Sequence, residues 1–162
     1  MATHLKNLSD FSNTIIPSGK GFKFAIVVAE WNHNVTHPLS EGALKTLIEN
    51  GVNKDDVIVS YVPGAFELAL GAQYHLEKGD VDAVICIGCV IQGDTKHFDF
   101  ICNGATQGIM DLNLKYNKPV IFGILTPNTL QQALDRAGGI HGNKGDEAAV
   151  TALQMVNLKN SL

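Results

Sequence analysis

Four runs of consecutive apolar residues recur along the chain and predict four strands. They occupy residues 22–29, 57–62, 83–91 and 120–125. None of these runs alternates apolar with polar residues, which is typical of strands buried on both faces of a parallel sheet. The pattern therefore predicts a sheet with helices packed against each of its faces.

The segments after the strands carry apolar residues at spacings of three and four, which predicts helices with one buried side. The first helix is expected to begin at Thr36-His37-Pro38 and to end at Gly51, because proline favours a first turn and glycine a C-terminal stop. A second is expected to end near Gly79 and to pack through Phe66, Ala69, Leu70, Gln73 and Leu76. A third carries the stripe Phe98, Ile101, Cys102, Ala105, Ile109, Leu112 and Tyr116.

Two further helices are predicted at 130–136 and around 148–156, with a glycine-rich joint at 138–145 between them. Residues 1–21 are polar and irregular, so we expect an N-terminal arm that is either loose or docked on a neighbour, followed by a single domain over 22–162. The order of elements predicts an α/β three-layer sandwich, with a four-stranded parallel sheet in flavodoxin-like order, helices on both faces and right-handed crossovers.

Composition narrows the classes of function. A net charge of −4 argues against nucleic-acid binding, which requires clustered Lys and Arg. Charged residues make up 17% of the chain, below the roughly 25% typical of soluble domains, which hints that other subunits cover part of the surface. The N-terminus lacks a signal-peptide pattern and no apolar run approaches the roughly 20 residues of a membrane span, so we expect a cytoplasmic protein. The 3 cysteines imply no disulfide framework.

The densest chemistry lies at residues 88–100, where a predicted strand runs through a short polar loop into a helix. Open α/β sheets bind ligands at the carboxyl ends of strands, and a helix N-terminus favours an anion. The loop adds the hydroxyl of Thr95, the cation of Lys96 and the imidazole of His97. Because an unperturbed histidine titrates near about 6.5, this loop predicts a phosphate seat beside an acid/base group; the alternative for His97 is a capping or packing role.

Other strand ends carry further candidates, each with an ordinary structural alternative. Trp31 is either a packing aromatic or a platform for a flat heteroaromatic ring. Glu67 is either a favourable partner of a helix dipole or an acceptor for ligand hydroxyls. Arg136 and Lys144 flank the glycine-rich joint, where solvation is the default role and completion of a phosphate site the alternative.

Cys86 and Cys89 form a C-x-x-C pattern, but inside a predicted strand. Residues three apart on a strand point to opposite faces about 10 Å apart, beyond the roughly 7 Å between Cα atoms that a disulfide allows. We therefore expect neither redox nor metal chemistry from them, and Cys102 is expected in the core. The sequence also contains no dinucleotide fingerprint, P-loop or nucleophile elbow.

Taken together, these residues resemble the 6,7-dimethyl-8-ribityllumazine synthases, the penultimate enzymes of riboflavin biosynthesis. The resemblance runs from about residue 22 to the C-terminus. Its motifs are AEWN at 29–32, VPGAFE at 62–67, VIQGDTKHF at 90–98, FGILT at 122–126, RAG at 136–138 and GNKG at 142–145. These six segments in this order, with the family's spacing, are highly specific.

The resemblance implies that 5-amino-6-(D-ribitylamino)uracil condenses with 3,4-dihydroxy-2-butanone 4-phosphate, releasing phosphate and water, without cofactor or metal. It implies a pyrimidine and ribityl site made by Trp31, Ala65, Phe66, Glu67, Val90, Ile91, Phe122 and Lys144. It implies a phosphate site made by Gly93, Asp94, Thr95 and Arg136, with His97 as the catalytic acid/base. Arg136, Phe122 and Lys144 would reach the site from a neighbouring subunit.

Two residues depart from the family's pattern. Gln92 stands where arginine is common, and Asp94 where a small neutral residue is common. An acidic side chain beside a phosphate is unfavourable unless it points away or pairs with a cation such as Lys96. These departures bear on phosphate affinity.

The resemblance also implies a homopentamer with active sites at subunit contacts. The short joint at 136–145 leaves open a 60-subunit icosahedral shell, and an association with riboflavin synthase, enclosed or otherwise, is open too. The rival classes are a non-catalytic cage, which would have lost His97, Arg136 or Glu67, and a flavodoxin-type binding module. The latter is disfavoured because residues 30–32 lack a phosphate loop.

Overall fold

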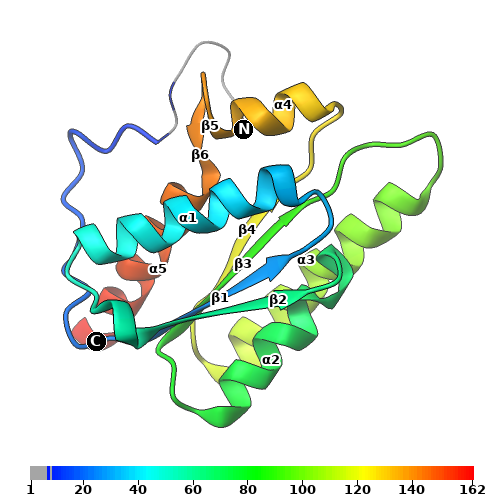
Figure 1. Ribbon diagram of the computed structural model, residues 1–162. Coiled ribbons are helices and arrows are strands. Elements are labelled where there is room, and N and C mark those ends of the chain that lie inside the picture. The colour runs from blue at the N-terminus through cyan, green and yellow to red at the C-terminus, as the bar shows by residue number, and fades with distance from the viewer. Residues whose placement is uncertain (1–6, 8) are drawn as a thin grey trace.

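A parallel sheet of four strands forms the centre of the molecule, in the order β2-β1-β3-β4 (Figure 1). The computed structural model describes residue 7 and residues 9–162. The strands are β1 (Phe24–Ala29), β2 (Val57–Val62), β3 (Ala83–Cys89) and β4 (Val120–Leu125). The ranges predicted for β2 and β4 are confirmed residue for residue, and the neighbouring pairs are all parallel.

Helices cover both faces of the sheet, which confirms the predicted three-layer α/β fold (Figure 1). On one face lie α1 (His33–Glu49) and α5 (Lys144–Ser161), and on the other lie α2 (Leu68–Lys78) and α3 (His97–Tyr116). The remaining elements are the short helix α4, two 3₁₀ turns and a small hairpin: α4 (Leu130–Asp135), η1 (Lys54–Asp56), η2 (Ala65–Glu67), β5 (Ala137–Gly139) and β6 (Gly142–Asn143). Among the described residues, no helix is both long and apolar enough to cross a membrane.

The uninterrupted apolar runs are explained by two separate hydrophobic cores. In β1, Phe24 and Ile26 face the core under α1 and α5, whereas Ala25 and Val27 face the core under α2 and α3. Every residue of β1 and of β3 is buried, as expected for the two central strands. Of the two edge strands, β2 is only partly covered, whereas β4 is buried along most of its length.

The expected start of α1 at Thr36–Pro38 is wrong, since the helix begins at His33 and contains Pro38. Asn32 adopts a left-handed conformation with φ 62°, which turns the chain into the helix directly after β1. Thr36 donates its hydroxyl hydrogen to the Ala29 carbonyl at 2.7 Å and ties the first turn to the strand end. Asparagine tolerates this backbone region better than most residues, so the turn, and not the proline, sets the boundary.

The predicted packing side of α2 is also wrong in part. The helix packs through Leu68, Gly71, Ala72 and Leu76, whereas Leu70 is half exposed and Phe66 lies outside the helix. The 3₁₀ turn η2 precedes α2, and its tighter winding shifts the phase of the residues that follow. Gly71 allows a close approach to the sheet, because a Cβ there would clash with Val27 and Val62.

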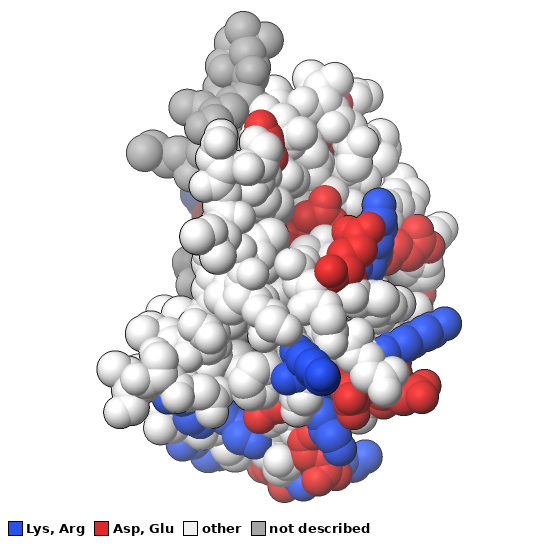
Figure 2. Space-filling view, turned by 90° about the vertical axis from the view of Figure 1, so that its left-hand side faces the viewer, with Lys and Arg blue, Asp and Glu red and all other residues white. Residues whose placement is uncertain are grey.

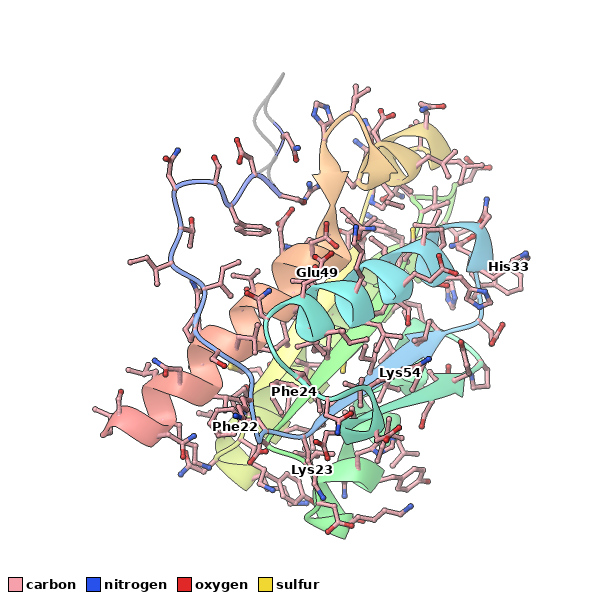
Figure 3. The ribbon with its side chains drawn as sticks, turned by 60° about the vertical axis from the view of Figure 1, so that its left-hand side comes forward. Phe22, Lys23, Phe24, His33, Glu49 and Lys54 are labelled. Atoms are coloured by element: carbon pink, nitrogen blue, oxygen red, sulfur yellow. The ribbon has the colours of Figure 1, made fainter. Side chains whose placement is uncertain are left out.

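The glycine-rich joint is not a plain loop, because β5 and β6 pair antiparallel within it. The described part of the N-terminal arm contacts its own chain nearby, where the Ser9 hydroxyl accepts from the Asn143 N–H at 2.8 Å. Residues 1–6 and 8 of the predicted arm lie outside the described residues, and the division of the chain at residue 21 stays a prediction. Figure 3 labels Phe24 at the start of β1 and His33 in the first turn of α1, just beyond the carboxyl end of that strand.

Candidate active site

An open cavity of about 580 Å³ lies at the carboxyl ends of β1, β2 and β3. Most of the predicted site residues line it: Trp31, Ala65, Phe66, Glu67, Val90, Ile91, Gly93, Thr95 and His97. They come from three loops that are far apart in sequence, which the parallel register brings to one edge of the sheet. This is the place where open α/β sheets bind ligands.

Hydrogen bonds between neighbouring loops fix the floor of the cavity. The Trp31 N–H donates to the Pro63 carbonyl at 3.1 Å and the Glu30 N–H to the Val62 carbonyl at 2.8 Å, so the loops after β1 and β2 run together. The Asn32 side chain donates to the Cys89 carbonyl at 2.9 Å and joins the loop after β1 to β3. Asn32 lines the cavity, and the sequence assigned it no specific role although it lies beside Trp31 at a strand end.

Two aromatic side chains present open faces at the cavity. Trp31 is 73% exposed and Phe66 is 58% exposed, although both are large and apolar. The Phe66 ring lies against Gly104 of α3, where a Cβ would clash with it, so its position is set by that helix. Exposed aromatic faces of this size favour the binding of a flat ring.

The loop between β3 and α3 is anchored at both sides. The Val90 N–H donates to the Leu125 carbonyl at 2.8 Å and the Gln92 N–H to the Pro127 carbonyl at 2.9 Å, which ties the loop to the segment after β4. The Gln92 side chain folds back and donates to the Gly93 carbonyl at 2.7 Å. Gly93 and Thr95 face the cavity, and the N-terminus of the 20-residue helix α3 points toward it at His97. This arrangement suits an anion.

Asp94, the least favourable of the predicted phosphate ligands, does not line the cavity. Lys96 does not pair with it either, because its ammonium lies 3.6 Å from the Asp99 carboxylate in an exposed pair one turn along α3. Such an exposed pair contributes little, so Lys96 is readily released to another anion. Asp94 therefore has no assigned role at the cavity.

The two thiols of the C-x-x-C pattern lie in different hydrophobic cores, which confirms that they point to opposite faces of the sheet. Burial raises the pKa of Cys86 to about 12 and the pKa of Cys89 to about 11. Cys89 lines the cavity but stays a protonated, weakly reactive thiol at neutral pH. Cys102 is only partly buried, so its expected place in the core is wrong in degree. In the described part of the chain, no group of three or more His, Cys, Asp and Glu could hold a metal.

Arg136 and Lys144 lie outside this cavity, around the β5–β6 hairpin on the side of α1 and α5 (Figure 1). The Arg136 guanidinium donates to the His141 carbonyl and to the Glu147 carboxylate, both at 2.5 Å. The Lys144 ammonium lies 3.3 Å from the other oxygen of Glu147. We call Arg136, Lys144 and Glu147 the hairpin cluster.

Phe122, the remaining predicted site residue, lies in β4 and packs against the core under α2 and α3. The cavity also has lining residues to which the sequence assigned no role in substrate binding or catalysis: Asn32, Gly64, Cys89, Phe98 and Ile101. One chain thus brings its aromatic side chains, the Glu67 carboxylate, the loop at Gly93 and His97 together at the cavity. Arg136 and Lys144 of the same chain lie elsewhere, at the β5–β6 hairpin.

Fold and cavity together define a small-molecule-binding protein of the doubly wound α/β class. Residues 21–160 match the model of the family described as 6,7-dimethyl-8-ribityllumazine synthase, and the chain belongs to this family.

Relatives with this same name are similar along nearly their whole length. One from Porphyromonas gingivalis is 57% identical over 159 residues, which cover 98% of this chain and 99% of the relative. One from Cytophaga hutchinsonii is 58% identical over 156 residues, covering 96% and 98%. One from Phocaeicola vulgatus is 52% identical over 162 residues, covering 100% and 96%.

Proposed function

We propose that this chain is a transferase of riboflavin biosynthesis that condenses 5-amino-6-(D-ribitylamino)uracil with 3,4-dihydroxy-2-butanone 4-phosphate. The products are 6,7-dimethyl-8-ribityllumazine, phosphate and water. The observation that carries this proposal is the family match over 21–160 together with a cavity lined by the residues that the family pattern requires. Neither the fold nor the cavity alone would identify the substrates.

The aromatic side of the cavity is the seat of the pyrimidine. Trp31 and Phe66 offer open ring faces, and Val90 and Ile91, which also line the cavity, would bind the ring edge through their backbone groups. Glu67 and Ala65 accept the ribityl chain, whose hydroxyls donate to the carboxylate. This assignment places the flat ring of the substrate against the exposed aromatic side chains of the cavity.

The loop before α3 is the seat of the phosphate. Gly93 and Thr95 offer backbone N–H groups and a hydroxyl beside the α3 N-terminus. Asp94 belongs to this loop but is not expected to bind the anion itself, because it does not line the cavity. With Gln92 neutral and folded onto Gly93, the phosphate needs cations from elsewhere.

Arg136, Lys144 and Phe122 of a neighbouring subunit complete the site in this proposal. Their absence from the lining of the chain's own cavity supports it, since an intramolecular role would place them on the cavity wall. Large apolar side chains on α3, namely Phe100, Met110 and Leu114, are also exposed in the single chain. Figure 2 shows one face on which charged residues gather low and at one side, and most of the remaining surface is uncharged.

The assembly proposed is a homopentamer in the cytoplasm, with a 60-subunit shell as the larger form and riboflavin synthase as its candidate associate. Analytical ultracentrifugation of the purified protein tests this. A species near five chains would refute the shell, and a monomer would refute shared active sites altogether.

The chemistry needs positioning and proton transfer more than a strong nucleophile. One water leaves when the amine of one substrate condenses with the carbonyl of the other, phosphate leaves by elimination, and a second water leaves when the second C–N bond closes the ring. Each of these steps requires a proton shuttle. His97 at the cavity wall is placed to move these protons. Holding both substrates in register can supply about 7–11 kcal/mol at most, and a histidine acid/base about 10²–10⁴-fold.

The direct test mixes the two substrates with the protein and follows lumazine fluorescence against a protein-free control. A rate that scales with protein concentration is expected. No rate above the control, from a folded and assembled protein, would favour the non-catalytic cage. Binding of free flavin without turnover would favour a flavodoxin-type module.

A further inference from the structure

The hairpin cluster is built around one carboxylate that receives three donors. Glu147 lies in the first turn of α5 and binds the Arg136 guanidinium at 2.5 Å, the Lys144 ammonium at 3.3 Å and the Ser9 hydroxyl at 3.3 Å. The side chains of Arg136 and Glu147 are only 11% and 18% exposed. A charged pair this well covered is screened less by solvent than an ordinary surface pair.

The surroundings of Arg136 hold it at both ends. Its backbone carbonyl accepts from the Lys144 N–H at 2.9 Å, and its second terminal nitrogen donates to the His141 carbonyl. Asn143, between the two cations, caps α5 by accepting from the Gly145 N–H and donates its side-chain amide to the Pro38 carbonyl of α1. The hairpin and Glu147 therefore hold the Arg136 side chain directly, and Asn143 ties the hairpin to α1.

Charge and donor counts leave the cluster able to bind an anion. Arg136 and Lys144 together outweigh the single carboxylate of Glu147, so the cluster keeps an excess positive charge. A guanidinium has five N–H donors, and the two bonds to Glu147 and His141 use only part of them. The carboxylate thus orients the cations without neutralising both.

We propose that Glu147 is a positioning residue for phosphate recognition, which holds Arg136 in the geometry in which it meets the substrate phosphate, while Lys144 shares the same carboxylate at a longer distance. This inference rests on the proposed function, in which these two cations act at the neighbouring subunit's site. Long cationic side chains lose conformational freedom when they bind an anion, and a side chain that is already fixed loses less. Glu147 itself does not touch the substrate.

The test is steady-state kinetics of Glu147→Gln with each substrate varied in turn. The KM for the butanone phosphate is expected to rise about tenfold, the size of one long side chain's lost pre-organisation. The kcat is expected to stay within about twofold, and the KM for the aminouracil to rise less than the KM for the butanone phosphate, because Glu147 binds Arg136 more closely than it binds Lys144. Glu147→Asp, which keeps the charge with a shorter reach, is expected to recover part of the loss.

Asp146→Asn is the matched control. Asp146 precedes Glu147 in the same turn of α5 and is also partly buried, but it accepts from the Thr46 hydroxyl and contacts neither cation. A KM increase of equal size in both variants would show that the effect is general loosening of α5, and would overturn the inference. So would an unchanged or lowered KM in Glu147→Gln, since the carboxylate would then be a bystander or a competitor of the phosphate.

A double-mutant cycle separates this inference from the proposed function. If Arg136→Ala alone leaves the KM for the butanone phosphate unchanged, the phosphate assignment fails and the role of Glu147 fails with it. If Arg136→Ala raises that KM, Glu147→Gln is expected to add little in the Arg136→Ala background, because the group it positions is gone. Additive effects would overturn the positioning role alone. Should Glu147→Gln fail to assemble in ultracentrifugation, Glu147→Asp carries the same cycle.

Discussion

The cavity and the hairpin cluster are two halves of one proposed site, and they are held in opposite ways. The cavity presents Trp31 and Phe66 with open faces, fixed by backbone bonds between loops. In the hairpin cluster, side chains hold one another, and Arg136 is almost covered. The aromatic half is open to its ligand, whereas the charged half is assembled before any ligand arrives.

The difference follows from the physics of the two ligands that the halves are proposed to bind. A flat ring is bound by area, and an exposed aromatic side chain provides area without needing a partner. A phosphate is bound by oriented donors, and long cationic side chains are poorly oriented unless other groups hold them. The aromatic side chains therefore need no holding partner, whereas the cations of the hairpin cluster are oriented by Glu147 before the phosphate binds.

The largest effect is expected from Arg136→Ala, which removes the most strongly held cation. We expect kcat/KM for the butanone phosphate to fall by about 10³, because one charge-assisted contact is lost and Glu147 is left partly buried with less compensation. The measurement is the initial rate of lumazine formation at limiting butanone phosphate. Full activity there would break the division into two halves, because the hairpin would then have no part in the site.

A smaller loss is expected from His97→Ala, since positioning by the rest of the site remains. We expect kcat to fall by about 10² and a slow but measurable reaction to persist. Added imidazole is expected to restore part of the rate. His33→Ala provides a control, because His33 is exposed at the start of α1 and does not line the cavity (Figure 3). An equal loss in both variants would remove His97 from its proposed role.

Trp31→Ala sharpens the comparison from the aromatic side. We expect the KM for the aminouracil to rise about tenfold and the KM for the butanone phosphate to stay unchanged, the reverse of the Glu147→Gln pattern. Trp31→Phe keeps a ring face and is expected to remain close to wild type. If Trp31→Ala raised both KM values equally, the two halves would not be separable by substrate.

The smallest effect concerns Asp146, the neighbour of Glu147 that contacts neither Arg136 nor Lys144. Burial raises the pKa of this carboxyl above its usual 3.8, so the folded state binds the proton more tightly than the unfolded state. Stability is therefore lost as pH rises through the folded pKa, and the charged group is unfavourable at neutral pH. Asp146→Asn is expected to be more stable at pH 7 by less than about 1 kcal/mol, because a half-exposed group is screened by solvent.

Thermal melting at several pH values checks this sign. The difference between Asp146→Asn and wild type is expected to vanish below the unfolded pKa, where both side chains are neutral. A variant that is less stable at pH 7 would show that the carboxylate charge is favourable at this position, as it is at Glu147.

The fold could be predicted because apolar runs report burial directly. The ranges of β2 and β4 were predicted from the positions of apolar residues along the chain. The buried stretches of β1 and β3 could be recognised in the same way, without knowing which strands they pair with. The boundaries of α1 and the packing side of α2 could not be predicted, because a left-handed Asn32 and a 3₁₀ turn set them. Both are local backbone conformations that the spacing of apolar residues along the sequence does not reveal.

The candidate site divides in the same manner. Residues at strand ends could be assigned to one cavity, because parallel strands must bring their carboxyl ends to one edge. The pairing of Arg136 with Glu147 could not be predicted, since it depends on a hairpin that returns the chain across the glycine-rich joint. Periodicity contains no signal for a contact of that kind.

Gly145, between Lys144 and Glu147, has a consequence for the variation that this chain can tolerate. A Cβ at this position would fall inside the Leu39 carbonyl oxygen of α1, so the backbones of α1 and α5 meet there without a side chain between them. In a saturation library selected for function, position 145 is expected to accept glycine alone. Positions 144 and 147 are expected to accept some substitutions with partial loss of function. The contrast between these neighbouring positions would calibrate how strictly the selection distinguishes a backbone clash from a weakened contact.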